Sequence, residues 1–220
     1  MRELKQEEKE LLMRCPLFQG MTEESLRRSL FFYHAEIRHF EKGEFIKKTT
    51  DRISFFGFVL SGIIQVCMDG FDGSHTVMAT VEKGRTFGES LCFLKKDSSV
   101  YICAAAEADV LCLRSDGLKN IKSAEENGFL LRFTSMLAER ALMMNDRIQI
   151  LSKLSIREKL MTMFSQYPKA ASGKTFEIPL SRGDMAAYLG TDRSALSREL
   201  SKMKKEGLID YYRNSFRITG

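Results

Sequence analysis

Between residues 179 and 207, apolar positions recur at helical spacing in two short stretches separated by a glycine. The first stretch opens on Ser181, a residue type that caps helix N-termini, and its apolar positions are Met185, Ala186 and Leu189. Gly190 follows, and glycine adopts the left-handed conformation at little cost. The pattern therefore predicts a short amphipathic helix that ends in a tight turn.

A second helix is predicted from Asp192 to Lys205, with Thr191 or Asp192 as its N-cap. Its positions at core spacing are Ala195, Leu196, Leu200 and Met203. Its polar positions on the other faces are Arg193, Ser194, Ser197, Arg198 and Lys202. Two helices joined by a tight turn can deliver the second helix to the DNA major groove. The simpler alternative is a solvated basic surface helix.

After this pair, the alternation of apolar and polar residues changes to that of a β-hairpin. Asn214 and Ser215 lie between Tyr212 and the segment 216–218, so we expect a turn at these two residues. The chain thus closes with a predicted winged helix-turn-helix.

From residue 40 to residue 113, short apolar segments rich in β-branched and aromatic residues alternate with glycine-containing turns. The segments are 42–46, 58–66, 69–73, 76–81 and 110–113. Their roughly regular spacing predicts a small β-barrel or β-sandwich. Together with the C-terminal helices, this indicates an α+β protein of two domains.

A long helix is predicted between these parts, because residues 128–154 contain strong helix formers and no proline. An apolar seam of nearly 3-4 spacing follows Leu130, Phe133, Leu137, Met144, Ile148 and Leu151. We interpret this seam as a dimer interface. A helix packed only on its own β-domain would produce a similar stripe.

Charge is distributed unevenly along the chain. Residues 153–220 contain 13 Lys and Arg against 7 Asp and Glu, whereas the rest contains 21 against 22. A positive C-terminal part suits a domain that neutralises phosphates. No stretch approaches the roughly 18 apolar residues of a membrane span, and five of the first eight residues are charged. We therefore expect a cytoplasmic protein without a membrane partner.

Catalytic and disulfide signatures are not found in the sequence. It contains no P-loop, no Gly-x-Ser-x-Gly and no His-Glu-x-x-His, so we predict that the protein is not an enzyme. Its five cysteines are an odd number without a Cys-x-x-Cys pair, which argues against a disulfide scaffold or a zinc ribbon. We interpret most of them as buried thiols.

The segment 193–200, placed after Leu189 and Gly190, resembles the helix-turn-helix of the Crp/Fnr family of transcription regulators. The resemblance implies an N-terminal double-stranded β-roll of the cyclic-nucleotide-binding type over 1–125, a dimerisation helix over 126–152 and a winged helix-turn-helix over 153–220. It further implies a homodimer on a palindromic operator in double-stranded DNA, controlled by a small-molecule effector. An activator would also contact RNA polymerase. A winged helix that binds a protein instead of DNA is the alternative.

Residues 84–90 resemble the phosphate-binding cassette of that β-roll, with Gly88 and Glu89 at the matching positions and Ser90 next to them. The arginine that should pair with the cyclic phosphate, ten residues beyond the glutamate, is replaced by Ser99. A serine hydroxyl cannot supply that countercharge. The positions that would read the adenine are Met144 and Asn145. We therefore predict an effector other than cyclic AMP, or a cassette kept for folding alone.

Other cofactors of the family are also not expected. Cys15 is the only cysteine of the N-terminal segment, so four thiolates for an iron-sulfur cluster cannot come from there. None of the three histidines lies in a recognisable haem motif. A thiol sensor among Cys92, Cys103 and Cys112 stays open beside the alternative of buried core cysteines.

The resemblance also assigns roles in DNA binding. Arg198 is the first candidate for a bidentate contact to guanine, Arg193 the second, and Ser197 meets a base or a phosphate. Ser194 stands where well-known branches of the family have glutamate, which predicts a different half-site. Phosphate contacts are expected from Lys202, Lys204, Arg213 and Arg217. The complete predicted DNA-binding set is Thr191, Arg193, Ser194, Ser197, Arg198, Lys202 and Arg217.

Overall fold

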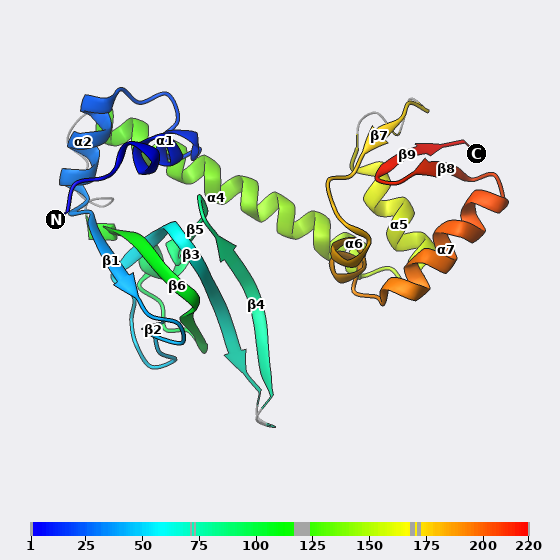
Figure 1. Cartoon of the computed structure of the whole chain (residues 1–220), viewed down its shortest axis with the longest axis horizontal. Coiled ribbons are helices and arrows are strands. Elements are labelled where there is room, and N and C mark those ends of the chain that lie inside the picture. Colours follow the sequence, from blue (N-terminus) through cyan, green and yellow to red (C-terminus); the bar gives the residue numbers. More distant parts are fainter. Residues whose placement is uncertain are drawn as a thin grey trace. The chain divides into compact units, whose positions relative to one another are not determined.

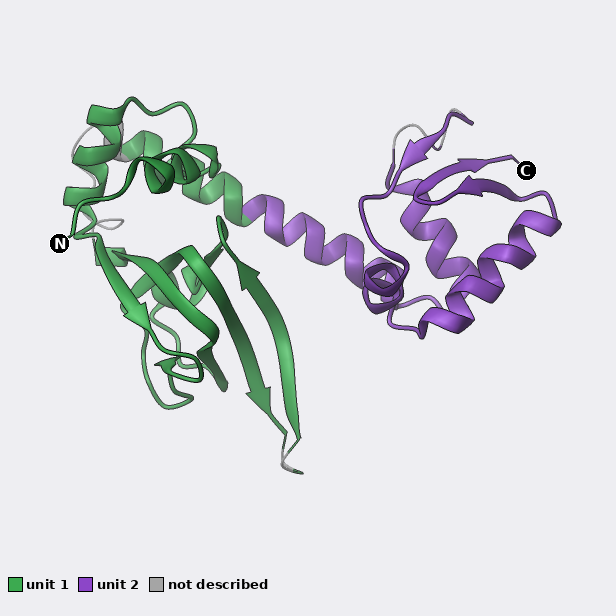
Figure 2. Ribbon diagram, viewed as in Figure 1, with its two compact units in different colours: residues 1–137 green, residues 138–220 purple. Residues whose placement is uncertain are grey.

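The computed structural model describes residues 2–70, 72, 74–116, 124–167, 170 and 173–219 (Figure 1). The chain divides into two compact units, residues 1–137 and 138–220 (Figure 2). Helix α4 (Ala124–Leu151) contributes to both units. Antiparallel sheets and helices occur in each, which confirms the predicted α+β class. Within the described ranges, no helix is long and apolar enough to cross a membrane.

The first unit is built around an antiparallel sheet with strand order β1-β6-β3-β4, while β2 pairs with β6 and β5 pairs with β3. Its strands are β1 (Glu36–Phe40), β2 (Phe45–Lys47), β3 (Phe55–Asp69), β4 (His75–Glu82), β5 (Thr86–Phe87) and β6 (Val100–Arg114). Its short helices are α1 (Gln6–Arg14), α2 (Glu23–Phe32) and α3 (Glu89–Leu94). This arrangement confirms the predicted β-roll.

The two 15-residue strands β3 and β6 form the centre of the roll. Both are longer than the segments expected from the sequence, because polar and small residues at their ends also join the ladder, as in the pair Cys67 and Tyr101. The expected strand at 42–46 is wrong in its first half. There Gly43 has φ +86° in a turn, and β2 begins only at Phe45.

One face of α4 packs against the roll. Phe129, Phe133 and Met136 are buried in its core, and Leu130 and Leu137 pack on its edge. The predicted dimer seam is therefore wrong at Phe133, whereas Leu130 and Leu137 are only partly buried and their part in a dimer stays a prediction. The stripe seen in the sequence there is the face that covers the protein's own β-roll.

Besides the C-terminal part of α4, the described residues of the second unit form three helices and a small sheet around a separate core. The helices are α5 (Ile156–Ser165), α6 (Arg182–Leu189) and α7 (Arg193–Lys205), and strands β7 (Phe176–Glu177), β9 (Ser215–Ile218) and β8 (Ile209–Tyr212) pair in that order. The expected hairpin turn is shifted by one residue. Arg213 and Asn214 form it, because Ser215 already pairs with Tyr212.

The cysteines are mostly buried, as predicted. Cys15, Cys67, Cys92 and Cys112 are buried and Cys103 is partly exposed, and all are free thiols. Burial raises the pKa of Cys92, and it raises that of Cys112 to about 12. High thiol pKa values oppose thiolate chemistry. The packing thus favours the core role over the sensor role for these two residues.

An acidic cluster surrounds His39 on β1. Its Nδ1 lies 2.9 Å from Oδ1 of Asp109, and its Nε2 lies 3.6 Å from Glu41 and 3.7 Å from Glu107. Arg2 approaches Asp109 at 3.5 Å. The hydrogen bond to Asp109 is the main cause of a raised His39 pKa, so the folded state favours the imidazolium.

We expect His39→Gln to destabilise the protein most at low pH. A raised folded-state pKa adds stability that is complete below the unfolded pKa of about 6.5 and disappears as the pH rises through the folded value. Urea unfolding of the wild type and of His39→Gln measures the difference in their free energies of unfolding. The measurement is made near pH 5.5 and near pH 9, roughly one pH unit or more below and above the unfolded pKa of about 6.5. An equal difference at the two pH values would contradict the role of the cluster.

Candidate functional site

Helices α6 and α7 and the turn between them follow the predicted capping pattern. The Ser181 hydroxyl accepts from the Asp184 amide at 3.2 Å, and Gly190 ends α6 with φ +60°. Of the two candidates for the next cap, Asp192 is the one used, since its Oδ1 accepts from the Ala195 amide at 2.8 Å. Local sequence therefore determines where each helix begins and ends.

The inner face of α7 anchors it in the second unit. Leu196, Leu200 and Met203 are completely buried there. Arg157 on α5 adds ion pairs to Glu199 and Glu206, each at 2.7 Å. These contacts raise the pKa of Arg157 and lower that of Glu206, so both groups stay charged near neutral pH. The rotation of α7 about its axis is thereby fixed.

The outer face of α7 is polar and positively charged. Its exposed residues are Arg193, Ser194, Ser197, Arg198, Ser201, Lys202 and Lys205, and a shallow groove is lined by Ser197, Arg198, Ser201, Lys202 and Lys205. Within the described part of the chain, no carboxylate lies within 4.0 Å of a guanidinium nitrogen of Arg193 or Arg198, the criterion for an ion pair. Both cations are therefore available to an anionic partner.

Ser201 and Lys205 were not among the predicted site residues. They follow Ser197 and Arg198 at helical spacing, so the signal was present in the sequence. Together with Lys202 they extend the basic face along α7.

The serines of this face use their protons inside the helix. Ser194 donates to Oδ1 of the capping Asp192 at 2.6 Å, and Ser197 donates to the Arg193 carbonyl at 2.9 Å. The bond from Ser194 is the main cause of the lowered Asp192 pKa. In this geometry each hydroxyl oxygen can still accept a hydrogen bond from a partner. Thr191 is half-buried at the turn, and its amide donates to the Ala186 carbonyl.

Three of the predicted phosphate-binding cations contact residues of the wing. Lys204 forms an ion pair with Asp210 at 2.7 Å, and Arg217 approaches the same carboxylate at 3.9 Å. Lys204 is the main cause of the lowered Asp210 pKa. Arg213, at the turn, extends over the exposed ring of Tyr212 at 5.4 Å. Contacts of these cations to phosphate stay predictions.

The cassette residues lie in the first unit where β5 meets α3. Gly88 is the N-cap of α3 with φ +79°, and a Cβ there would lie 3.3 Å from Cδ1 of Ile53. The Glu89 side chain is buried, whereas Ser90 is exposed. Ser99 is exposed at the start of β6 and contacts the sulfur of Met68 at 3.9 Å. The left-handed backbone angle therefore favours glycine at position 88, and a Cβ there would also crowd the Ile53 side chain.

A buried cation near Ser99 was not found from the sequence. Lys47 is only 2% exposed, and its ammonium donates to the carbonyls of Val100, Lys48 and Ser98 at 2.8, 2.9 and 3.3 Å. Burial lowers its pKa. Three donors meet three acceptors, so the ammonium holds the segment before β6 instead of presenting free donors. A lone lysine in a strand gives no sequence signal for such a role.

The remaining predicted effector residues belong to the second unit. Met144 is 66% exposed on α4, and the neighbouring Asn145 is also exposed. Their participation in an effector site stays a prediction.

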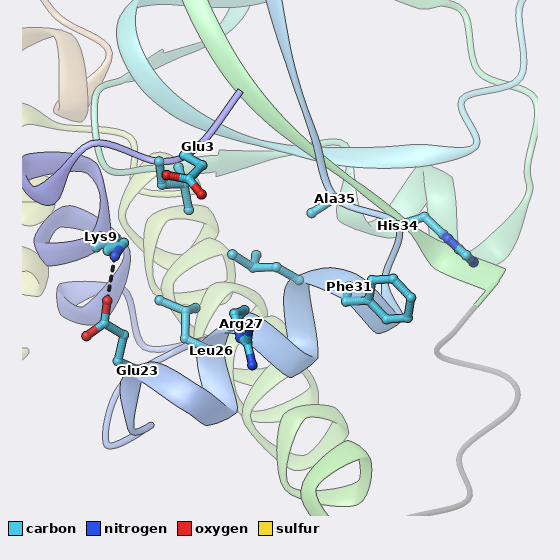
Figure 3. A pocket seen from close by; sticks show the side chains of 10 residues that line it. Glu3, Lys9, Glu23, Leu26, Arg27, Phe31, His34 and Ala35 are labelled. Atoms are coloured by element: carbon cyan, nitrogen blue, oxygen red, sulfur yellow. Dashed lines mark hydrogen bonds and ion pairs between the residues drawn. The ribbon is translucent and has the colours of Figure 1, made fainter. Parts of the chain in front are cut away.

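An apolar hollow of about 490 Å³ lies beside α1 and α2 in the first unit (Figure 3). Leu26, Leu30 and Ala35 are among its lining residues, together with the exposed Phe31. An ion pair of 2.5 Å joins Lys9 to Glu23 at its border. Among the described residues, no group of three or more His, Cys, Asp and Glu side chains could hold a metal ion.

Comparison with known proteins gives matches over both units. Residues 37–125 match the family model of the cyclic nucleotide-binding domain, and residues 137–219 match that of the Crp-like helix-turn-helix domain. The chain is 24% identical over 195 residues to the cyclic AMP receptor protein of Thermus thermophilus, covering 88% of each chain. It is 26% identical over 182 residues to the nitrogen fixation regulation protein FixK of Bradyrhizobium diazoefficiens, covering 78% of this chain and 73% of the relative.

The fold is shared with solved structures. The structure of CprK in complex with OCPA superposes with a TM-score of 0.59 at 18% sequence identity, and the match covers 89% of both chains. The matched proteins include a cyclic AMP receptor protein and CprK in complex with OCPA, so the shared fold does not specify one ligand.

Proposed function

The chain belongs to the Crp/Fnr family of DNA-binding transcription regulators, and we propose that it acts as a homodimer that reads a palindromic operator through the outer face of α7. The observation that supports this proposal best is the pair of arginines, Arg193 and Arg198, on a helix whose opposite face is fully buried. A helix held in this way can enter a major groove without reorganisation.

Within this face, residues of the N-terminal half of α7 read bases and the others hold the backbone. Arg198 forms the bidentate contact to guanine O6 and N7, with Arg193 as the second candidate. Ser194 and Ser197 offer hydroxyl oxygens as acceptors, since their protons are bound within the helix. Lys202 and Lys205 meet phosphates, which fix register without reading sequence.

We expect Arg198→Ala to weaken binding to the preferred duplex by about 1 to 3 kcal/mol and to relax the preference at one base pair. Lys202→Ala should weaken binding to all duplexes alike and reduce the salt slope by about one. Competition binding against duplexes varied at single positions, at several salt concentrations, separates the two effects.

An Arg198→Ala variant that loses the same factor on every sequence would contradict the base-reading role. A wild-type protein whose affinity for duplex DNA is weak and independent of salt would instead favour a winged helix that binds a protein partner.

The dimer interface is proposed on the face of α4 that does not cover the β-roll. Exposed residues follow a strict 3-4 spacing there: Leu131, Thr134, Ala138, Ala141, Asn145 and Ile148. This spacing is the seam of a two-stranded coiled coil, and a single asparagine in such a seam favours a defined register. Leu142 and Met144, also exposed, border it with further apolar surface.

Sedimentation equilibrium tests this interface. We expect a dimer for the wild type and at least a tenfold weaker dimer for Ala141→Asp, because two like charges would face each other in the seam. Glu139→Lys, an exposed change off the seam, is the control. Unchanged dimerisation of Ala141→Asp would contradict the assigned face.

The effector is proposed to bind at the cassette of the first unit through Gly88, Glu89, Ser90 and Ser99. We propose that the effector differs from cyclic AMP, because position 99 lacks the arginine that would pair with the cyclic phosphate. The ammonium of the nearby Lys47 already donates to three carbonyls. Calorimetric titration with cyclic AMP should give no saturable heat, and micromolar binding would contradict this.

Effector binding would change the packing of the paired α4 helices and thereby the spacing of the two α7 helices. As an activator the dimer would also contact RNA polymerase.

A further inference from the structure

The side chain of Arg182, the first residue of α6, joins this helix to the wing. Its guanidinium carbon lies 5.0 Å from the ring centre of Phe216 and 5.4 Å from that of Tyr211. Its Nη2 also donates to the carbonyl of Arg213 at 2.5 Å. Burial lowers the pKa of this guanidinium, but arginine stays charged at any physiological pH. One side chain thus contacts two wing strands and the turn between them.

The turn that Arg182 contacts is held in an unfavourable conformation. Arg213 has φ +51°, in the left-handed region that side chains other than glycine rarely adopt. The next carbonyl, that of Asn214, accepts from the Ile178 amide at 2.9 Å. A strained turn persists where its surroundings hold it. Both carbonyls of this turn are bound from the segment that leads into α6 and from α6 itself.

Helix α7 also contacts strand β8 of the wing, through Lys204. Lys204 on α7 places its ammonium 5.2 Å from the ring centre of Tyr211 and donates to the Tyr211 carbonyl at 3.1 Å. Its ion pair with Asp210 adds a further contact to β8. Tyr211 therefore receives one cation from α6 and one from α7. The wing tip is fixed relative to the basic face of α7.

We propose that Arg182 is a positioning residue, which holds the wing so that the exposed guanidinium of Arg213 meets the DNA backbone beside the groove that α7 enters. This inference rests on the proposed function. Nη2 of Arg182 already donates to the Arg213 carbonyl and the guanidinium packs against two rings, so we assign the effect of Arg182 on DNA binding to the position of Arg213. Arg213 itself extends outward over Tyr212, which is 74% exposed.

A double-mutant cycle on DNA affinity tests the coupling. Arg213→Ala should weaken binding about threefold to tenfold and lower the salt slope by about one, as for one lost phosphate contact. Arg182→Met should cause a similar loss and a similar fall in slope. In the double variant, adding the second substitution should lower the DNA affinity by less than about a factor of two.

The matched control is Arg182→Met combined with Lys202→Ala, because Lys202 lies on α7 away from the wing contacts. In this control double variant, the two fold-losses of DNA affinity should multiply. Multiplied losses for Arg182→Met with Arg213→Ala would overturn the inference, since Arg182 would then act independently of the wing tip.

Trypsin cleavage after Arg213 provides a readout without DNA. Arg182→Met should speed this cleavage severalfold, while cleavage sites in the first unit keep their rates. Arg182→Lys should restore the slow wild-type cleavage only in part, because an ammonium lacks the planar fork of a guanidinium. An unchanged cleavage rate at Arg213 in Arg182→Met would overturn the inference that Arg182 holds the turn. A wild type that binds no duplex would overturn the proposed function and the DNA role of Arg213 together, while the cleavage rates still decide whether Arg182 holds the turn.

Discussion

The burial of one face of α7 is the constraint on which the functional part of the molecule depends. Leu196, Leu200 and Met203 lie one turn apart and are inaccessible to solvent, so the residues between them must face outward. Because the helix is periodic, the packing of these three residues also places Arg193 and Arg198 on its exposed face. Burial of three such side chains stabilises the domain by roughly 1.5 to 3 kcal/mol each, which a surface ion pair does not match.

Local chemistry explains why this part could be predicted from the sequence. Ser181, Gly190 and Asp192 determine helix boundaries through contacts with residues at most four positions away, and such contacts can be read from sequence spacing. The winged arrangement could be predicted from the sequence for the same reason. The turn was misplaced by one residue because Arg213, not a glycine or asparagine, takes the positive φ.

Features that depend on distant contacts were missed. Helix α4 carries two apolar stripes, and only its packing against the β-roll shows that Phe133 belongs inside and Leu131 outside. The roles of Lys47 and Arg182 likewise depend on carbonyls 51 and 31 residues away. Such partners leave no trace in local spacing. The cassette was found from a resemblance, while its effector depends on space and charge that the motif does not encode.

Selection of random duplex DNA by the purified protein tests whether a dimer reads a palindromic operator, since it assumes neither an operator sequence nor an effector. A dimer with two copies of α7 should recover an inverted repeat whose half-site centres lie about 34 Å apart, one turn of the double helix, with two chains bound to each duplex. Recovery of no shared sequence, or of a single half-site bound by one chain, would contradict the account.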